Sequence, residues 1–327
     1  MSGRISTRAR YLRKELFLER NHDLSRTALV LGSGRSGTTW LAESIARQHR
    51  SRLLFEPFHP QLGAIREGAR LFLDPTENPS VFERSVRRIL SGRVRGAYID
   101  EIRIARLPRG RIVKDVHAAN LLPWLRTNHP AVPVVYVVRH PIAASLSRLR
   151  SDTFYGIGDY LATPPGREDA EDSPVAAWLP LYDTYRDHPE PLVRLVAEWC
   201  IENVYPLRGS DDAGGALTFY ENAVLDPVSE LTRLGELCAG ALGPARVPPK
   251  IGQLRRPSAM DWRRTAAEAH RSGEWERLLG SWTSEVPGPV VERCLSILSD
   301  FGLDRLYGEG PLPIREAPAS PRSDRPS

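Results

Sequence analysis

A glycine-rich segment between a short apolar run and a helical pattern carries residues that could bind an anionic group. It reads Gly32-Ser33-Gly34-Arg35-Ser36-Gly37-Thr38-Thr39-Trp40. Gly32 and Gly37 have the spacing of the phosphate-binding loop G-x-x-x-x-G-K-[ST], but Thr38 stands where that loop has lysine. Glycines let the backbone fold around an anion, and the N–H groups that open a helix supply positive charge. The missing lysine disfavours a nucleoside triphosphatase, and Arg35 puts a fixed charge beside the anion instead.

A second segment, Val135-Tyr136-Val137-Val138-Arg139-His140-Pro141, could bind another anionic group. Arg139 follows an apolar run typical of a buried strand, and ligands of open parallel sheets bind at the carboxyl ends of strands. Ser147 lies eight residues further on, in the helical pattern that Pro141 opens. The planar guanidinium of arginine suits phosphate. We therefore interpret Arg139 and Ser147 as a pair that binds phosphate.

Both segments resemble those of the sulfotransferase family that uses 3′-phosphoadenosine 5′-phosphosulfate (PAPS) as donor. The family's loop for the 5′-phosphosulfate reads P-K-S-G-T-T-W, and its carbohydrate-modifying and bacterial branches have arginine in place of this lysine, as at Arg35. Its 3′-phosphate motif is a strand that ends in arginine, with serine eight residues on, as at Arg139 and Ser147. The resemblance implies donor contacts from Arg35, Ser36, Gly37, Thr38, Thr39, Trp40, Arg139, Ser147 and Tyr220.

Two further segments are similar to motifs of this family. Phe219-Tyr220-Glu221-Asn222, followed by Asp226-Pro227, is similar to Y-E-D-L…D-P, whose tyrosine lies near the adenine, as does the aromatic residue at Trp40. Residues 255–263 are weakly similar to the loop R-K-G-x-x-G-D-W-K that closes on the donor, which implies contacts from Arg256 and Ser258. The resemblance spans residues 26–306. It implies in-line transfer of a sulfuryl group from PAPS to a hydroxyl or amine of an acceptor, with no metal ion.

An alcohol acceptor needs a base, and two residues that follow predicted strands are candidates, Glu56 and His117. The resemblance to the carbohydrate and bacterial branches favours Glu56, whereas the phenol and steroid branch has Lys-Thr-His. Here His117 stands three residues after Lys114, so strand alternation predicts that it points away from this lysine. It is then a ligand of the acceptor or a structural histidine. Arg35 and Lys114 are expected to stabilise charge on the leaving phosphate, and a carboxylate base works best if burial raises its pKa.

Apolar runs and helical patterns alternate along the chain. Strands are predicted at 28–31, 53–55, 111–116, 132–138 and 216–220, and helices at 38–49, after Pro141, and at 228–242 and 290–301. The run at 132–138 is rich in valine without alternation, which is typical of a central parallel strand covered on both faces. The sequence therefore predicts an α/β fold, P-loop-like and three-layered, with a mainly parallel central sheet flanked by helices.

The composition divides the chain into three parts. They are a basic N-terminal extension at 1–25, a domain at 26–310 that the resemblance makes a sulfotransferase domain, and a tail at 311–327 that we expect to be disordered. Residues 151–191 mix Gly, Pro, acidic and aromatic residues, and we interpret them as a loop or lid that binds the acceptor. Their composition suits a sugar or glycolipid hydroxyl first, and a small phenol or lipid alcohol second.

Composition and charge narrow the class of protein. Hydrophobic residues make up 41% and charged residues 26%, which is ordinary for a globular protein. No apolar run approaches the ~20 residues of a membrane helix, no secretory signal precedes the domain, and the three separated cysteines fit buried thiols, so we expect a cytoplasmic protein. The net charge of +5 lies in the two ends of the chain, so we expect no nucleic-acid partner. A P-loop nucleotide kinase or other phosphotransferase, and a noncatalytic nucleotide-binding module, stay open as alternatives.

Overall fold

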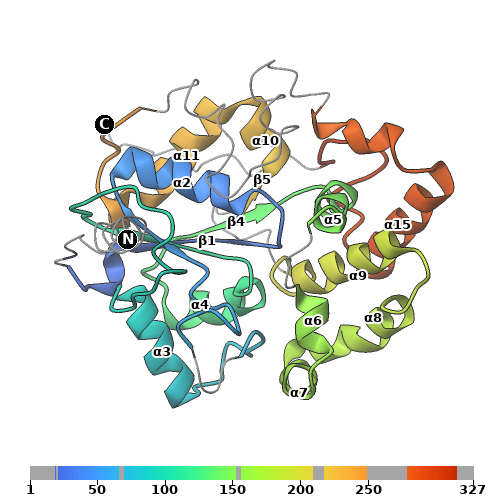
Figure 1. The fold of residues 1–327 in the computed structure, drawn as a ribbon, viewed down its shortest axis with the longest axis horizontal. Helices are drawn as coiled ribbons and strands as arrows, with labels where there is room; N and C mark the ends of the chain where they lie inside the picture. The colour runs from blue at the N-terminus through green and yellow to red at the C-terminus, as the bar shows by residue number, and fades with distance from the viewer. Residues whose placement is uncertain are drawn as a thin grey trace, which may run out of the picture.

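The central element of the fold is a parallel sheet. The computed structural model describes Glu19 and residues 21–65, 70–151, 156–208, 217–248 and 278–314. Among these residues, five strands form one sheet in the order β2-β3-β1-β4-β5, with every pairing parallel. Figure 1 labels three of them, β1, β4 and β5. They are β1 (Thr27–Gly32), β2 (Arg52–Phe55), β3 (Arg111–Asp115), β4 (Val134–Val138) and β5 (Leu217–Phe219). All residues of these strands are buried. Burial on both faces explains why their sequences are apolar without alternation. The predicted α/β class is confirmed.

Helices cover both faces of the sheet. On one face, α2 (Thr38–His49) and α11 (Pro227–Leu242) pack with Val30, Ile112 and Val135 in one apolar cluster. On the other face, α3 (Ser80–Leu90) and α4 (Leu122–Asn128) pack with strand residues whose side chains point to that face, such as Leu29 and Val113. Successive strand residues point to opposite faces, so β1, β2, β3 and β4 each supply residues to both clusters. The short element η1 (Leu24–Arg26) precedes β1, whereas η2 (Ala119–Leu121) connects β3 to α4 and α10 (Tyr220–Leu225) connects β5 to α11.

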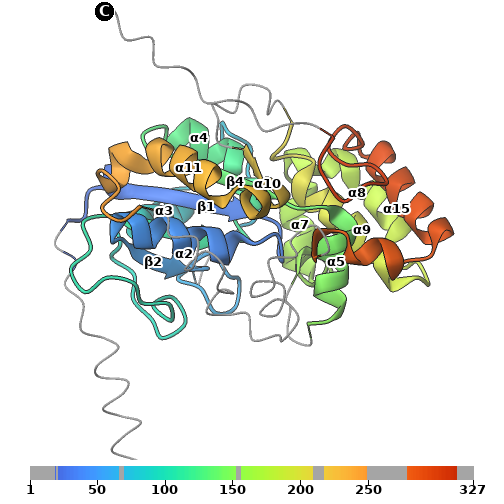
Figure 2. The same ribbon diagram turned by 90° about the horizontal axis from the view of Figure 1, so that it is seen from above.

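A second group of helices lies beyond the carboxyl ends of the strands. We call it the helical lobe: α5 (Pro141–Leu149), α6 (Ile157–Leu161), α7 (Pro164–Glu171), η3 (Pro174–Trp178), α8 (Leu179–Tyr185), α9 (Pro191–Asn203), η5 (Ser281–Ser284) and α15 (Gly288–Asp300). Figure 2 shows the arrow of β1 pointing toward this lobe. Side chains that follow the strands therefore lie between sheet and lobe. No helix within the described ranges is long and apolar enough to cross a bilayer.

The described part of the predicted acceptor loop is helical. Residues 156–191 contain α6, α7, η3 and α8, and α6 and α8 both pack on α9. The aromatic residues of this stretch contribute to the core, since Tyr160 and Tyr182 are buried. A role in acceptor binding stays a prediction.

Described residues from both predicted chain ends contact the central domain. Glu19, assigned to the N-terminal extension, is buried and forms ion pairs with Arg52 and Arg111 at the amino ends of β2 and β3. Residues 311–314, assigned to the tail, fold back, and the N–H of Ile314 donates to the carbonyl of Leu306 at 2.9 Å. These residues belong to the folded domain.

Candidate active site

The carboxyl edge of the sheet gathers most of the predicted site residues. The register aligns Phe55 with Lys114, Leu31 with Asp115, and Gly32 with Val137. Crossing the sheet from β2 to β4 covers three strand spacings, about 14 Å at ~4.8 Å each. The strands are followed by Glu56 (β2), His117 (β3), the glycine-rich loop (β1), Arg139 (β4) and Tyr220 (β5). Chain order and spatial order differ here, and ligands of open α/β sheets bind where the strand order reverses.

The glycine-rich loop follows β1 and opens α2, as predicted. Gly37 has φ +84° and precedes the first helical residue, with no side-chain hydrogen bond to the helix start. No side chain therefore caps this helix start, and N–H groups at such a position are a favourable place for an anionic group. A Cβ at Gly37 would lie 2.3 Å from Cδ2 of Tyr220, and one at Gly32 would lie 2.3 Å from the carbonyl oxygen of Val137. The two glycines are required by close approach as well as by backbone angle.

Arginines and a serine form an anion-binding cluster on the β4 side of the loop. Arg35, itself in the left-handed region at φ +66°, donates from Nε to Oγ of Ser147 at 3.0 Å. Arg139 donates from Nη1 to the carbonyl oxygen of Arg35 at 3.0 Å. Its Nε is buried and has no hydrogen-bond partner among the described residues. Two guanidinium groups and a hydroxyl thus converge, and part of the Arg139 donor set remains available to an oxyanion.

Two aromatic residues border this cluster. The Arg139 guanidinium carbon lies 4.5 Å from the ring centre of Tyr220, and Trp40 meets Tyr220 edge to face with ring centres 6.4 Å apart. Tyr220 was predicted at the end of a strand. It is instead the first residue of α10, because β5 ends at Phe219.

A second cluster lies on the β2 and β3 side of the loop. Glu56, with φ +42°, forms a buried ion pair with Lys114 and accepts a hydrogen bond from the hydroxyl of Tyr98 at 2.5 Å. Burial alone would raise the pKa of Glu56, but the charge of Lys114 and the hydrogen bonds outweigh it and lower the pKa to about 2. The structure therefore does not show the raised pKa that would make Glu56 a good carboxylate base. In this arrangement Glu56 is ionised and a weak base.

His117 lies in the second cluster, against the prediction that it points away from Lys114. That prediction is wrong because β3 ends at Asp115, so strand alternation does not reach residue 117. Asp115 accepts hydrogen bonds from the N–H groups of His117 at 2.8 Å and Ala118 at 3.3 Å, which turns the chain. His117 Nε2 comes within 3.9 Å of Glu56 Oε2. Burial lowers the pKa of His117 to about 3, so its imidazole is neutral at physiological pH.

Asp115 also joins the two turns that carry this cluster. Its Oδ2 accepts from the N–H of Phe58 at 2.8 Å, in the turn that follows Glu56. Burial and the nearby charge of Glu56 raise the pKa of Asp115 to about 7. His59, from the same turn, packs against His117 with ring centres 4.5 Å apart and ring planes tilted by 60°.

Four residues of the site were missed by sequence reasoning. Tyr98 and His59 lie in turns without periodicity, so no pattern marks them. Asp115 and Arg148 directly follow the predicted residues Lys114 and Ser147 in the chain, and this position could have indicated them. Nε and Nη2 of Arg148 both lie 3.2 Å from the carbonyl oxygen of Gly34, and the side chain pairs with the buried Glu202 of α9.

The predicted site residues separate into two groups. Arg35 belongs with Arg139 and Ser147, whereas Lys114 belongs with Glu56 and His117. Arg256 and Ser258 lie outside the described residues. Within the described ranges, no group of three or more His, Cys, Asp or Glu side chains is arranged to hold a metal ion.

Comparison with known proteins gives matches in structure alone. No family model matches the chain, and no curated protein matches its sequence. A solved sulfotransferase domain from the curacin biosynthetic pathway superposes with a TM-score of 0.41 and 17% identity, over 84% of this chain and 97% of that one. A sulfotransferase from Alicyclobacillus acidocaldarius gives a TM-score of 0.35 and 16% identity, over 87% of this chain and 100% of that one.

Proposed function

We propose that this chain is a sulfotransferase that moves a sulfuryl group from PAPS to a hydroxyl or amine of a carbohydrate, glycolipid or other small-molecule acceptor. The observation that carries the proposal is the pair of clusters that flank the glycine-rich loop. One is cationic and bordered by aromatic rings, and the other combines a lysine, a carboxylate and a neutral imidazole. Such an arrangement fits an elongated donor with an anionic group at either end and its reacting group near the second cluster.

The donor-binding residues fit this role. The loop N–H groups at the start of α2 would bind the central phosphate, as helix starts do. Arg139, with its unpartnered buried Nε, and Ser147 would bind the 3′-phosphate. Arg35 contacts Ser147 and would reinforce the same end of the donor, and Tyr220 and Trp40 would border the adenine.

The second cluster would carry out the transfer. The acceptor oxygen forms a bond to sulfur while the bond from sulfur to the donor phosphate oxygen breaks, and the acceptor's proton passes to a base. Lys114 would neutralise charge on the leaving phosphate. When the positive charge of Lys114 interacts with that oxygen, it stabilises the Glu56 carboxylate less. The pKa of Glu56 then rises and the carboxylate becomes more basic. Glu56 would then accept the proton, with His117 as a ligand of the acceptor.

The test begins with the nucleotide. Calorimetry should give tight binding of adenosine 3′,5′-bisphosphate and much weaker binding of AMP, without magnesium. Labelled sulfate from PAPS should then appear on members of a hydroxyl library, identified by mass spectrometry. Magnesium-dependent ATP binding with no affinity for the bisphosphate would establish a P-loop phosphotransferase instead. Bisphosphate binding with no transfer to any acceptor would establish a noncatalytic module.

A further inference from the structure

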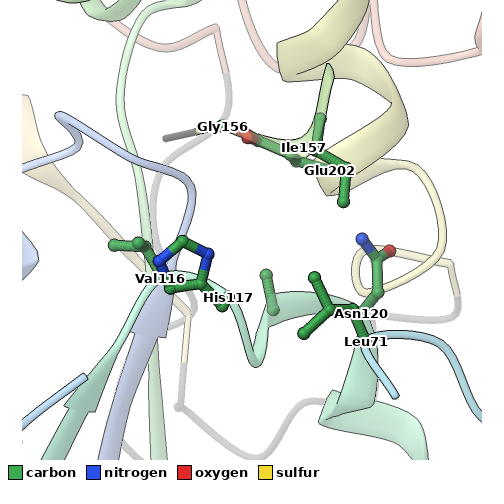
Figure 3. A pocket seen from close by; sticks show the side chains of 8 residues that line it. Leu71, Val116, His117, Asn120, Gly156, Ile157 and Glu202 are labelled. Carbon is green, nitrogen blue, oxygen red and sulfur yellow. The ribbon is translucent and has the colours of Figure 1, made fainter. Parts of the chain in front are cut away.

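A small pocket lies between the turn after β3 and the helical lobe. It is lined by Leu71, Val116, His117, Ala119, Asn120, Gly156, Ile157 and Glu202 (Figure 3). It has room for about one water-sized group. His117 belongs to the pocket and also to the cluster of Glu56 and Lys114, so a group bound here lies next to the proposed transfer site.

Asn120, on η2, is a polar residue of this pocket wall whose side chain lacks a hydrogen-bond partner among the described residues. It is 2% exposed, its Oδ1 is buried, and its amide makes no hydrogen bond to any described residue. A buried polar group without a partner destabilises a fold, whereas an apolar residue of the same shape would not. Figure 3 shows Asn120 and His117 on either side of the pocket. The side-chain amide therefore has hydrogen-bonding capacity that no described protein group uses.

The pocket wall is polar but carries no free charge among the described residues. The imidazole of His117 is neutral, because burial lowers its pKa to about 3. The carboxylate of Glu202 is paired with Arg148 and accepts the N–H of Ile157. The remaining lining side chains are apolar. An anion would meet no unpaired cation among the described lining residues, since the nearby Arg148 and Lys114 are already paired with Glu202 and Glu56.

We propose that this pocket binds an uncharged hydroxyl- or amide-bearing end of the acceptor, and that Asn120 is the hydrogen-bonding residue that selects it over an anionic end. The proposal rests on the function proposed above and adds a substrate class to it. The asparagine amide both donates and accepts, as hydroxyl and amide partners require. Because the pocket holds a single small group, the rest of the acceptor lies outside it.

The test uses three probes of nearly equal size on the full chain saturated with adenosine 3′,5′-bisphosphate: ethanediol, acetamide and acetate. Binding is followed by the side-chain amide signals of Asn120 in nitrogen-15 NMR, assigned by their loss in Asn120→Leu, and by the ring signals of His117. Ethanediol and acetamide should shift both, with acetate at least about tenfold weaker because a buried unpaired charge is unfavourable. In Asn120→Leu, half-saturation by the neutral probes, followed at His117, should rise roughly three- to tenfold, the worth of one neutral hydrogen bond.

A second buried asparagine is the matched control. Asn203 donates to the carbonyl oxygen of Trp199 at 2.7 Å and lies 3.1 Å from the Tyr136 hydroxyl, so Asn203→Leu should lower Tm. Asn120→Leu should not lower Tm, since its amide has no protein partner to lose. Acetate binding as tight as acetamide, no probe shifting Asn120, or a Tm loss in Asn120→Leu equal to that in Asn203→Leu would each overturn the proposal. Failure of the bisphosphate itself to bind would instead overturn the proposed function, whatever the probes do.

Discussion

The ion pair of Glu56 and Lys114 gives the sharpest prediction, because both partners are buried and one charge determines the state of the other. The pKa of Glu56 is about 2, against an ordinary value of 4.5. A difference of this size corresponds to about 3 kcal/mol in favour of the charged carboxylate. In Lys114→Met the burial that raises the pKa remains and the main opposing charge is gone. We expect the pKa of Glu56 to rise above 4.5, toward about 7, the value to which burial raises the pKa of Asp115 and of Glu198.

Stability should follow with a definite sign. Wild-type Glu56 has a folded-state pKa below its unfolded value, so it stabilises the fold above pH 4.5 and this contribution is lost as pH falls toward 2. In Lys114→Met the folded-state pKa lies above the unfolded value. The free energy of unfolding of the variant, relative to wild type, should then fall as pH rises from 4.5 through the new pKa. Breaking a buried pair typically costs about 3–5 kcal/mol, so the loss should be large at pH 8 and smaller at pH 5.

The pKa itself can be measured by carbon-13 NMR on protein labelled only at the glutamate carboxyl carbon, which leaves Asp115 silent. The Glu56 signal is identified by its absence in Glu56→Gln, prepared in both backgrounds. Lys114→Arg keeps the charge and should leave the Glu56 pKa well below 4.5. If Glu56 still titrates below 4 in Lys114→Met, then His117 and the hydroxyl of Tyr98, and not Lys114, keep the carboxylate ionised. The proposed rise in the basicity of Glu56 when Lys114 turns to the donor would then be refuted.

Three further predictions concern the proposed donor and transfer residues. Arg139→Ala and Ser147→Ala should weaken binding of adenosine 3′,5′-bisphosphate far more than binding of AMP in calorimetry, since charge-assisted contacts are worth roughly 1.5–3 kcal/mol each; equal losses would remove the 3′-phosphate assignment. Arg35→Ala should also weaken binding of the bisphosphate more than binding of AMP, because Arg35 contacts Ser147 at the proposed 3′-phosphate site; a loss confined to turnover at saturating PAPS would instead place its charge at the leaving phosphate. Glu56→Gln should lower turnover on the order of 100- to 10,000-fold, whereas His117→Asn should mainly raise the KM of the acceptor; the opposite pattern would reverse their roles.

The sheet and the glycine-rich loop were predictable because local sequence determines them. Strands buried on both faces need unbroken apolar runs, and the observed β1 to β4 start or end within two residues of the predicted ranges. Arg139 and Ser147 were predictable for a related reason. Their spacing places one at a strand end and the other on the following helix, and the structure brings both to Arg35.

The protonation state of Glu56 could not be predicted from sequence, because it depends on partners far along the chain. Tyr98 and Lys114 are 42 and 58 residues away, and only the packing of β2 against β3 brings them to the carboxylate. Burial alone would raise the pKa of this carboxylate, but the sign of the net shift depends on which charge is buried with it. For His117, the missing information was where β3 ends.

The pocket illustrates how buried charges away from the proposed chemistry position the groups that would carry it. Asp115 holds the turns after β2 and β3 through three N–H groups, which fixes His117 on one side of the pocket. Arg148 reaches the carbonyl oxygen of Gly34 in the glycine-rich loop and the carboxylate of Glu202 on the other side. The same arginine therefore ties the loop that would bind the donor to the wall that would bind the acceptor. Removing either partner would leave the other charge buried and unpaired, so a change at Glu202 should alter both donor and acceptor affinity, whereas a change at Asn120 should alter acceptor affinity alone.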